Sequence, residues 1–214
     1  MRARLFAAIA AMVVVVTASN ILVQYPVAFD LGPVHLGDLL TWGAFTYPFA
    51  FLVTDLTNRY DGPNRARFVV VIGFVFALGL SFYLATPRIA IASASAFLIG
   101  QLLDIAIFSR LRNRFWLVPP LTGSLLGSLI DTLIFFTIAF APVLGFVDGW
   151  FGMEDGSLGF GAPWLGVGPE VPLWTSLATG DFLVKFLAAL LLLAPYRVLM
   201  GKVMPLPPLG AARA

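Results

Sequence analysis

The sequence has 214 residues, of which 60% are hydrophobic and 11% are charged, and its mean hydropathy is +0.95. A soluble domain of this size carries roughly twice that charged fraction, so the composition excludes an ordinary water-soluble protein. The chain has no Cys and one His, His35, which excludes thiol chemistry and most His-based metal sites. The formal charge of +2 does not indicate a nucleic-acid partner, because the basic residues lie between apolar stretches.

Six apolar stretches follow one another along the chain, each close to the length that crosses a bilayer as a helix. They cover residues 5–23, 39–56, 68–85, 89–108, 121–141 and 173–194. Unpaired backbone groups are costly in lipid, so we expect an all-α membrane protein with six transmembrane helices in one bundle. This bundle takes up residues 1–204, and we expect neither a cofactor nor a metal site in it.

Basic residues set the predicted orientation of the bundle. Eleven of the thirteen Lys and Arg fall on one side of the predicted spans, while Arg88 lies in a short turn on the other side and Lys185 lies inside a span. The basic side faces the cytoplasm by the positive-inside rule, so both termini are predicted to be cytoplasmic. The Pro-rich residues 205–214 are then a short cytoplasmic tail.

The longest predicted loop, residues 143–172, lies on the opposite side. It is rich in Gly, which permits irregular backbone, and it carries aromatic residues suited to a membrane interface: Trp150, Phe151, Phe160 and Trp164. Two interpretations remain open: a flexible loop on the lipid headgroups, or a lid over an outward-facing cavity.

Polar side chains recur inside the predicted spans, where such residues usually face the bundle interior and serve a function. Asn20 and Gln24 share one helix face, and so do Gln101 and Asp104. Asp131 lies about ten residues into its span, near the middle of the membrane, and a purely structural role is the less favoured interpretation for it.

Structural interpretations compete with these functional ones. Asp181 and Lys185 have the i,i+4 spacing of a simple ion pair, and Gly123 and Gly127 form a GxxxG pattern that more often serves packing than chemistry. The acids near the basic side, Asp55 and Asp104, could pair with Arg59, with Arg110 or with other basic residues there.

An interior of carboxylates, amides and aromatic rings suits a small, flat, polar ligand. Carboxylates accept from N–H donors, and amide side chains both donate and accept. Aromatic residues of the second span could stack on a ring: Trp42, Phe45, Tyr47 and Phe49.

Several segments together resemble the queuosine precursor transporter family, part of the vitamin uptake transporter group of bacterial inner-membrane proteins. The segments are Ala18–Gln24, Thr41–Phe45, Tyr47–Arg59, Arg88–Ser93, Gly100–Asp104, Phe108–Arg112 and Asp131–Phe140. The most specific combination is Thr-Asp-Leu-Thr, Gly-Gln-x-Leu-Asp and Asp-Thr-x-x-Phe-Phe. The resemblance covers the chain from the first span to about Lys185, and the long Gly-rich loop departs from the family pattern.

This resemblance implies import of 7-cyano-7-deazaguanine, 7-aminomethyl-7-deazaguanine or both. It also implies a six-helix fold similar to the substrate-binding subunits of energy-coupling-factor transporters, a homodimer, and action as a solitary transporter. The candidate substrate-binding residues that it carries onto this chain are Asn20, Gln24, Asp55, Gln101, Asp104, Asp131 and Lys185.

Two other functions compete with the solitary importer. One is the substrate-binding subunit of a multi-component vitamin importer, since the chain has no phosphate-binding loop of its own. The other is an intramembrane serine protease with Ser124 or Ser128 as nucleophile, which the position of His35 outside the spans disfavours. We therefore expect a transporter and not an enzyme.

Overall fold

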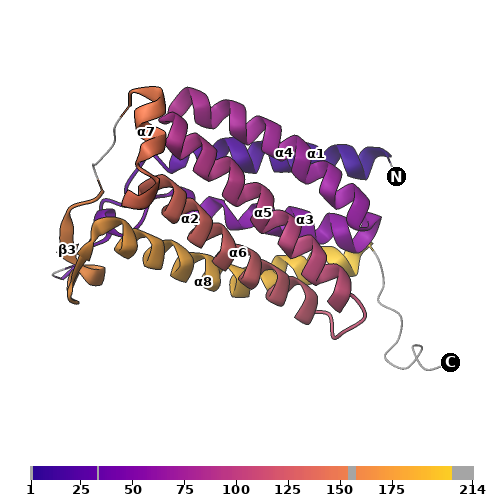
Figure 1. The fold of residues 1–214 in the computed structure, drawn as a ribbon. Coiled ribbons are helices and arrows are strands. Elements are labelled where there is room, and N and C mark those ends of the chain that lie inside the picture. The colour runs from indigo at the N-terminus through magenta and orange to yellow at the C-terminus, as the bar shows by residue number, and fades with distance from the viewer. Residues whose placement is uncertain (1, 33, 154–157, 204–214) are drawn as a thin grey trace.

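The computed structural model describes residues 2–32, 34–153 and 158–203, which form one elongated helical bundle (Figure 1). The predicted tail, 205–214, lies outside the described residues. The helices are α1 (Arg2–Leu22), α2 (Gly43–Thr46), α3 (Pro48–Asp61), α4 (Pro63–Leu84), α5 (Pro87–Leu111), α6 (Val118–Phe140), α7 (Phe146–Phe151) and α8 (Leu173–Val203). The long helices run roughly along one axis, and α1 begins at the same end of the bundle at which α8 ends (Figure 1).

Five of the described helices are long and apolar enough to cross a membrane: α1, α4, α5, α6 and α8. They match five of the six predicted stretches and confirm a multi-pass, all-α membrane protein. The prediction of six spans is not confirmed, because the stretch 39–56 is divided between a connection and the helices α2 and α3. α3 has only 14 residues and contains Asp55, Arg59 and Asp61.

Backbone hydrogen bonds explain why the second stretch starts late. The N–H of Val27 donates to the carbonyl of Leu40 at 3.0 Å, and the N–H of Trp42 donates to the carbonyl of Tyr25 at 3.0 Å. The backbone there is paired with the segment that follows α1, so a helix begins only at Gly43. A Cβ on Gly43 would lie 2.8 Å from the Cα of Val23, so a larger residue would not fit.

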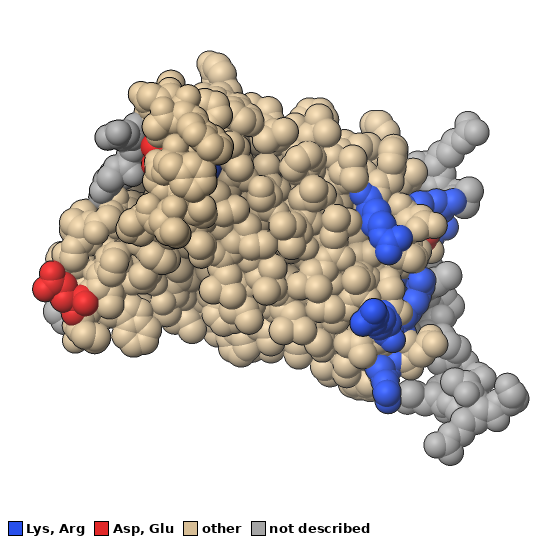
Figure 2. All heavy atoms as spheres, viewed as in Figure 1, with Lys and Arg blue, Asp and Glu red and all other residues tan. Residues whose placement is uncertain are grey.

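The two ends of the bundle differ in charge. Described arginines gather where α1 begins, where α3 meets α4, where α5 ends and toward the end of α8, and Figure 2 shows blue atoms at this end of the visible face. We refer to it as the basic end, and to the opposite end, formed by residues 23–32, 34–42, 141–153 and 158–172, as the loop end. Between them the surface is apolar: Phe6, Val14 and Leu191 are all more than 60% exposed, as suits contact with lipid chains.

Short elements cover the loop end. Two antiparallel hairpins lie there, β1 (Asp30–Leu31) with β2 (Val34–His35) and β3 (Gly161–Pro163) with β4 (Glu170–Pro172). Three 3₁₀ turns lie among these elements: η1 (Leu36–Asp38) between β2 and α2, η2 (Pro142–Leu144) between α6 and α7, and η3 (Trp164–Gly166) between β3 and β4. The described part of the predicted loop 143–172 is thus built from α7 and a hairpin.

A buried ion pair fixes α7 to the bundle. Nη1 of Arg88, at the start of α5, lies 2.6 Å from Oδ2 of Asp148 in α7, and both side chains are at most 7% exposed. Arg88 also donates to the carbonyls of Ile138 (2.7 Å) and Ala141 (2.6 Å), where α6 ends. The lone basic residue at this end therefore closes the C-terminus of a helix, whose last carbonyls have no partner within the helix.

Glycines allow α5 and α6 to pack closely. A Cβ on Gly127 would lie 2.9 Å from the carbonyl oxygen of Gly100 and 2.8 Å from Cε1 of Phe51, while a Cβ on Gly123 would overlap Oδ1 of Asp104. This confirms the packing interpretation of the GxxxG pattern.

Replacing Gly127 by Ala should therefore destabilise the bundle. Overpacking typically costs about 1–3 kcal/mol, which for a chain of this size lowers the melting temperature by roughly 2–12 °C. Gly79→Ala is the matched control, since a Cβ there meets nothing within 4 Å. Thermal unfolding in detergent should separate the two variants, and equal melting temperatures would contradict the close packing of α5 on α6.

Candidate functional site

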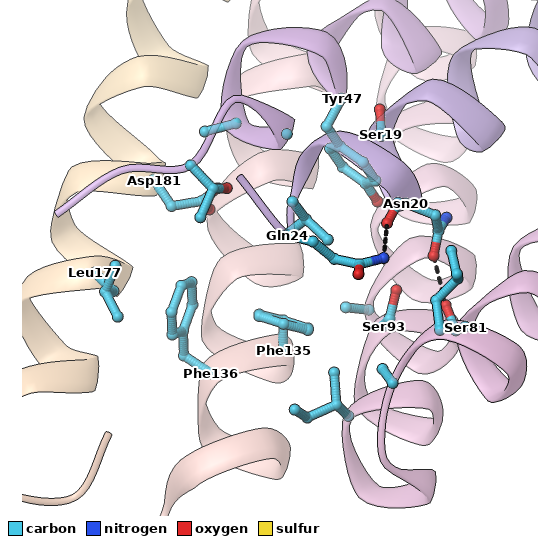
Figure 3. A pocket seen from close by; sticks show the side chains of 18 of the residues that line it. Ser19, Asn20, Gln24, Tyr47, Ser81, Ser93, Phe135, Phe136, Leu177 and Asp181 are labelled. Carbon is cyan, nitrogen blue, oxygen red and sulfur yellow. Dashed lines mark hydrogen bonds between the residues drawn. The ribbon is translucent and has the colours of Figure 1, made fainter. Parts of the chain in front are cut away.

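A cavity of about 700 Å³ lies within the bundle toward the loop end. Its volume falls in the range of about 300–1,000 Å³ that is usual for small-molecule sites. Residues of α1, α2, α4, α5, α6 and α8 line it (Figure 3). Met153 and Leu158 of the loop region line it as well. Its polar lining includes Ser19, Asn20, Gln24, Tyr47, Ser81, Ser93, Asp131, Asp181 and Lys185.

Amide side chains of α1 and of the segment after it form one wall. Nδ2 of Asn20 donates to the carbonyl of Val16 at 2.9 Å, and Oδ1 of Asn20 accepts from the Ser81 hydroxyl at 2.7 Å. Gln24 is exposed, and its Nε2 makes one long bond of 3.4 Å to the carbonyl of Asn20 (Figure 3). Asn20 is therefore held in place, whereas the Gln24 amide can turn to donate to or accept from a ligand.

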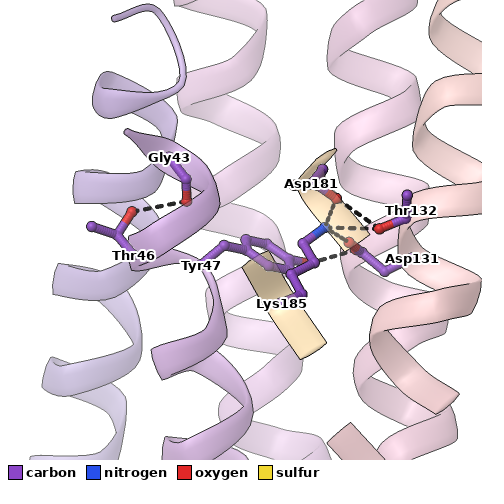
Figure 4. Close-up of polar contacts among 7 residues, drawn as sticks. All are labelled: Gly43, Thr46, Tyr47, Asp131, Thr132, Asp181 and Lys185. Carbon is purple, nitrogen blue, oxygen red and sulfur yellow. Dashed lines mark hydrogen bonds and ion pairs between the residues drawn. The ribbon is translucent and has the colours of Figure 1, made fainter. Parts of the chain in front are cut away.

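A cluster around Lys185 forms the floor of the cavity (Figure 4). Lys185 Nζ lies 2.7 Å from Oδ2 of Asp131 and 2.6 Å from Oδ2 of Asp181, and it donates to the Thr132 hydroxyl at 3.2 Å. Thr132 donates to Asp181 at 2.7 Å, and the Tyr47 hydroxyl donates to Oδ1 of Asp131 at 2.6 Å. We call Tyr47, Asp131, Thr132, Asp181 and Lys185 the Lys185 cluster.

The charges of this cluster do not balance. One ammonium faces two carboxylates, so the ionised groups sum to a formal −1. The Asp131 and Lys185 side chains are 5% and 6% exposed, but that of Asp181 is 17% exposed. Asp181 is therefore the acid that the cavity reaches most easily, and the floor favours ligands that donate hydrogen bonds or carry positive charge.

Phenylalanines of α6 form an apolar wall. Phe135, Phe136 and Phe140 line the cavity, and the rings of Phe135 and Phe136 meet edge to face with centroids 5.0 Å apart. The expected stacking residues of the second stretch are mostly elsewhere. Tyr47 lines the cavity, but Trp42, Phe45 and Phe49 do not, and each is at least 41% exposed.

Three candidate residues lie deeper in the bundle and do not line the cavity. Asp55, Gln101 and Asp104 are at most 2% exposed. Oε1 of Gln101 accepts from the Thr54 hydroxyl at 2.5 Å, and Oδ2 of Asp55 accepts from the Ser124 hydroxyl at 3.1 Å.

The predicted alternative, that these acids pair with neighbouring arginines, is wrong for the described residues. Neither Asp55 nor Asp104 forms a salt bridge with any of them. Arg59 instead donates to the Tyr196 hydroxyl at 3.2 Å and to the carbonyl of Arg112 at 3.0 Å. The basic side chain is thus occupied in joining α3 to α8 and to the end of α5.

The lone histidine is far from the serines proposed as nucleophiles. His35 lies in the β1–β2 hairpin, and its Nδ1 is 2.8 Å from Oδ1 of Asp30. This hydrogen bond and the charge of Asp30 raise the pKa of His35, which stabilises the imidazolium. Ser124 contacts Asp55 instead, so the arrangement does not support a serine protease.

The structure thus brings four of the seven candidate residues together around the cavity: Asn20, Gln24, Asp131 and Lys185. Sequence reasoning did not single out Ser81, Ser93, Phe135 or Phe136 as lining residues. The two phenylalanines do stand in the Asp-Thr-x-x-Phe-Phe segment, Phe135 four residues after Asp131 and Phe136 four residues after Thr132, so helical spacing could have identified them. Isolated serines carry no such signal.

A multi-pass helical bundle that encloses a cavity with the charged Lys185 cluster at its floor has the features of a membrane transporter. The family described as "Putative vitamin uptake transporter" matches residues 41–86 and 80–200, and the chain belongs to this family. No solved structure matches the chain significantly.

Three curated relatives share the same functional name. The chain is 42% identical over 147 residues to "Queuosine precursor transporter" of Escherichia coli (strain K12), covering 59% of this chain and 64% of that protein. It is 37% identical over 153 residues to "Probable queuosine precursor transporter" of Haemophilus influenzae, covering 59% and 65%. A Bacillus subtilis relative with the same printed name is 26% identical over 194 residues, covering 77% and 73%. The match thus spans less than two thirds of the first two relatives.

Proposed function

We propose that this chain imports queuosine precursors across the bacterial inner membrane, with both termini in the cytoplasm and the cavity open to the outside. The relatives' names support the substrate class, and the gathering of arginines at the basic end supports the orientation. The observation that carries the proposal is the cavity itself, where a floor of net negative charge lies beside a phenylalanine wall.

The chemistry of this cavity suits 7-deazaguanine bases. The N–H groups on the guanine-like edge would donate to Asp181, whose carboxylate is the most exposed of the Lys185 cluster. Gln24 would pair with the ring's acceptors, and Phe135 or Phe136 would stack on the flat bicycle. The aminomethyl cation of 7-aminomethyl-7-deazaguanine would also be attracted by the net charge of the floor, whereas 7-cyano-7-deazaguanine would rely on hydrogen bonds alone.

The proposal includes action without an ATPase partner and assembly as a homodimer, both of which the family resemblance implies. Uptake by the purified chain in liposomes tests solitary action. If uptake instead requires a co-purifying ATPase, the chain is the substrate-binding subunit of a multi-component importer.

Ligand binding provides the direct test. Tyr47 lines the cavity and Trp42 stands between two lining residues, Thr41 and Gly43, so intrinsic fluorescence is a suitable readout. Both 7-deazaguanine bases should bind more tightly than guanine. Binding of neither base by the folded, detergent-purified protein would contradict the proposed function.

Replacing Asp181 by Asn should weaken binding of both bases by roughly tenfold or more, because a charge-assisted hydrogen bond is worth about 1.5–3 kcal/mol. The fold should persist, since Asp131 and Thr132 still hold Lys185. Asp61→Asn is the matched control, because it removes a carboxylate at the basic end, where Asp61 pairs with Arg65. Equal dissociation constants for the two variants would exclude Asp181 from ligand contact.

A further inference from the structure

Two acids lie buried below the cavity without an ion-pair partner among the described residues. Asp104 is fully buried, and both of its carboxylate oxygens lack a hydrogen-bond partner in the described part of the chain. Asp55 is 2% exposed, and its Oδ1 also lacks a partner. We call Asp55 and Asp104 the buried acid pair.

The same segment of α6 brings the two acids together. Ser124 donates to Asp55, and the neighbouring residue, Gly123, packs so closely on Asp104 that a Cβ would overlap Oδ1 of this acid. The packing of α5 on α6 and of α3 on both helices thus places the two carboxyl groups against one turn of α6.

An amide group beside the pair is also unsatisfied. Gln101 is fully buried one turn before Asp104 on α5, and its Oε1 accepts from Thr54, the residue before Asp55. Its Nε2 has no partner among the described residues. A buried polar group without a partner is costly, so donor and acceptor capacity remains here for something that the protein itself does not supply.

The cations of the surrounding helices are engaged elsewhere. Arg59, one turn after Asp55 on α3, is bound to Tyr196 of α8 and to the carbonyl of Arg112. Lys185 of α8 is held between Asp131 and Asp181 at the cavity floor. The charge of Arg59 acts on Asp55 without a direct contact, and this one charge cannot balance two ionised acids. Ionising both acids would therefore bury uncompensated charge, which is strongly unfavourable, so the pair requires a further cation from solution.

The space beside the pair favours the smallest cation. A cavity of about 20 Å³ touches Asp55 and Ser124, which is room for about one water molecule. No group of three or more His, Cys, Asp or Glu side chains that could hold a metal ion occurs within the described ranges. A hydrated metal ion, which keeps several oxygen ligands, does not fit here, but a proton does.

The pair is separated from the cavity by one apolar layer. Tyr47, directly before α3, lies at the cavity floor, and along α3 Phe51 lies one turn below it and Asp55 one turn further. Phe51 is 2% exposed, meets the Tyr47 ring edge to face at 6.1 Å, and lies against Gly127 of α6. Phe51 thus closes the route from the cavity toward the basic end, and the acid pair lies just beyond it.

We propose that Asp55 and Asp104 form a proton site that couples import to the proton gradient. The pair binds one proton, which converts one carboxylate to a carboxylic acid, and releases that proton toward the cytoplasm when the Phe51 layer opens and the base is delivered. This inference rests on the proposed function, since it names the ion that drives the same transport.

Uptake of 7-cyano-7-deazaguanine into liposomes tests the site, because this probe carries no charge of its own. With one proton per base, an inward gradient of about one pH unit supports roughly tenfold accumulation. A protonophore should abolish accumulation, and an inward sodium gradient should not replace the proton gradient. Accumulation driven by sodium, or uptake that is indifferent to the pH gradient, would overturn the proposal.

Asp104→Asn, an isosteric change, should bind the probe as the wild type does and exchange it across the membrane, but lose gradient-driven accumulation. Asp55→Asn should behave likewise, while Asp61→Asn should accumulate normally. Retained accumulation in Asp104→Asn and Asp55→Asn would overturn the proton site. Exchange of the probe by the wild type distinguishes failure of the proposed function from failure of the proton site. If the wild type does not exchange the probe, the proposed function is refuted. If it exchanges the probe but does not respond to the pH gradient, only the proton site is refuted.

Infrared spectroscopy gives a readout that does not depend on substrate. Wild-type protein at neutral pH should show the carbonyl stretch of a buried carboxylic acid, and this band should shift or vanish in both Asp55→Asn and Asp104→Asn. Asp131→Asn should leave the band in place, because Asp131 is ion-paired with Lys185. An unchanged band in both acid-pair variants, or no such band in the wild type, would contradict the assignment.

Discussion

Replacing Lys185 by Met should cost the protein about 3–5 kcal/mol of stability. Removing one partner of a buried ion pair leaves an uncompensated charge, which is the origin of this large penalty. Here Lys185 faces two acids, Asp131 and Asp181, at 2.7 and 2.6 Å, so its loss leaves two carboxylates behind. For a chain of this size the melting temperature should fall by roughly 6–20 °C.

The double variant Lys185→Met with Asp131→Asn separates charge from packing. It removes the ammonium together with the more deeply buried acid and leaves Asp181, which the cavity can hydrate and Thr132 still contacts. It should therefore unfold at a higher temperature than Lys185→Met alone, and the double-mutant cycle should give a coupling energy of about 1–3 kcal/mol. If the two substitutions have additive effects on the free energy of unfolding, the 2.7 Å contact between Lys185 and Asp131 contributes little to stability.

Sequence spacing identified only part of this cluster. The i,i+4 spacing of Asp181 and Lys185 predicted their contact, because such residues share a helix face. The contacts of Lys185 with Asp131 and Thr132, more than fifty residues earlier, depend on how α6 and α8 rotate against each other. Side-chain spacing within one helix contains no information about that rotation, so the cluster could not be assembled from the sequence.

Hydropathy predicted the long helices well, since apolar length is what the bilayer demands. It failed for residues 39–56, where polar side chains and the backbone pairing of Val27 and Trp42 delay the helix. A polar residue of this stretch accounts both for the missed span and for part of the buried acid pair. Asp55 lowers the apolar character of α3, and it is also one of the two acids that have no ion-pair partner among the described residues.

Arg88 shows the limit of charge counting. As the lone basic residue at the loop end it was an exception to the predicted orientation, but its guanidinium is buried and spans three groups: Asp148, Ile138 and Ala141. Arginine suits this role because its planar fork presents several donors at once. The loop 143–172 was open to two interpretations, a flexible loop on the headgroups or a lid over a cavity. Met153 and Leu158 of its described part line the cavity, which favours the lid.

Replacing Arg88 by Met should accordingly destabilise the protein by about 3–5 kcal/mol, because Asp148 would be left as a buried, unpaired acid. Two carbonyls at the end of α6 would lose their donor as well. Amide hydrogen exchange should rise most in 146–151, the residues of α7, because Arg88 is the ion-pair partner that fixes this helix to the bundle. Binding of the base should weaken too, since the segment after α7 lines the cavity.

Arg67→Met is the matched control, because Arg67 is exposed and, within the described part of the chain, bonds only Asn64, at 3.0 Å. Its effect on stability should stay within about 0.5 kcal/mol. The double variant Arg88→Met with Asp148→Asn should recover part of the loss by removing the unpaired charge, but not all of it, since the carbonyls of Ile138 and Ala141 remain without a donor. If Arg88→Met and Arg67→Met unfold alike, the loop end is held by its hairpins and apolar contacts, and the buried pair with Asp148 is not what positions α7.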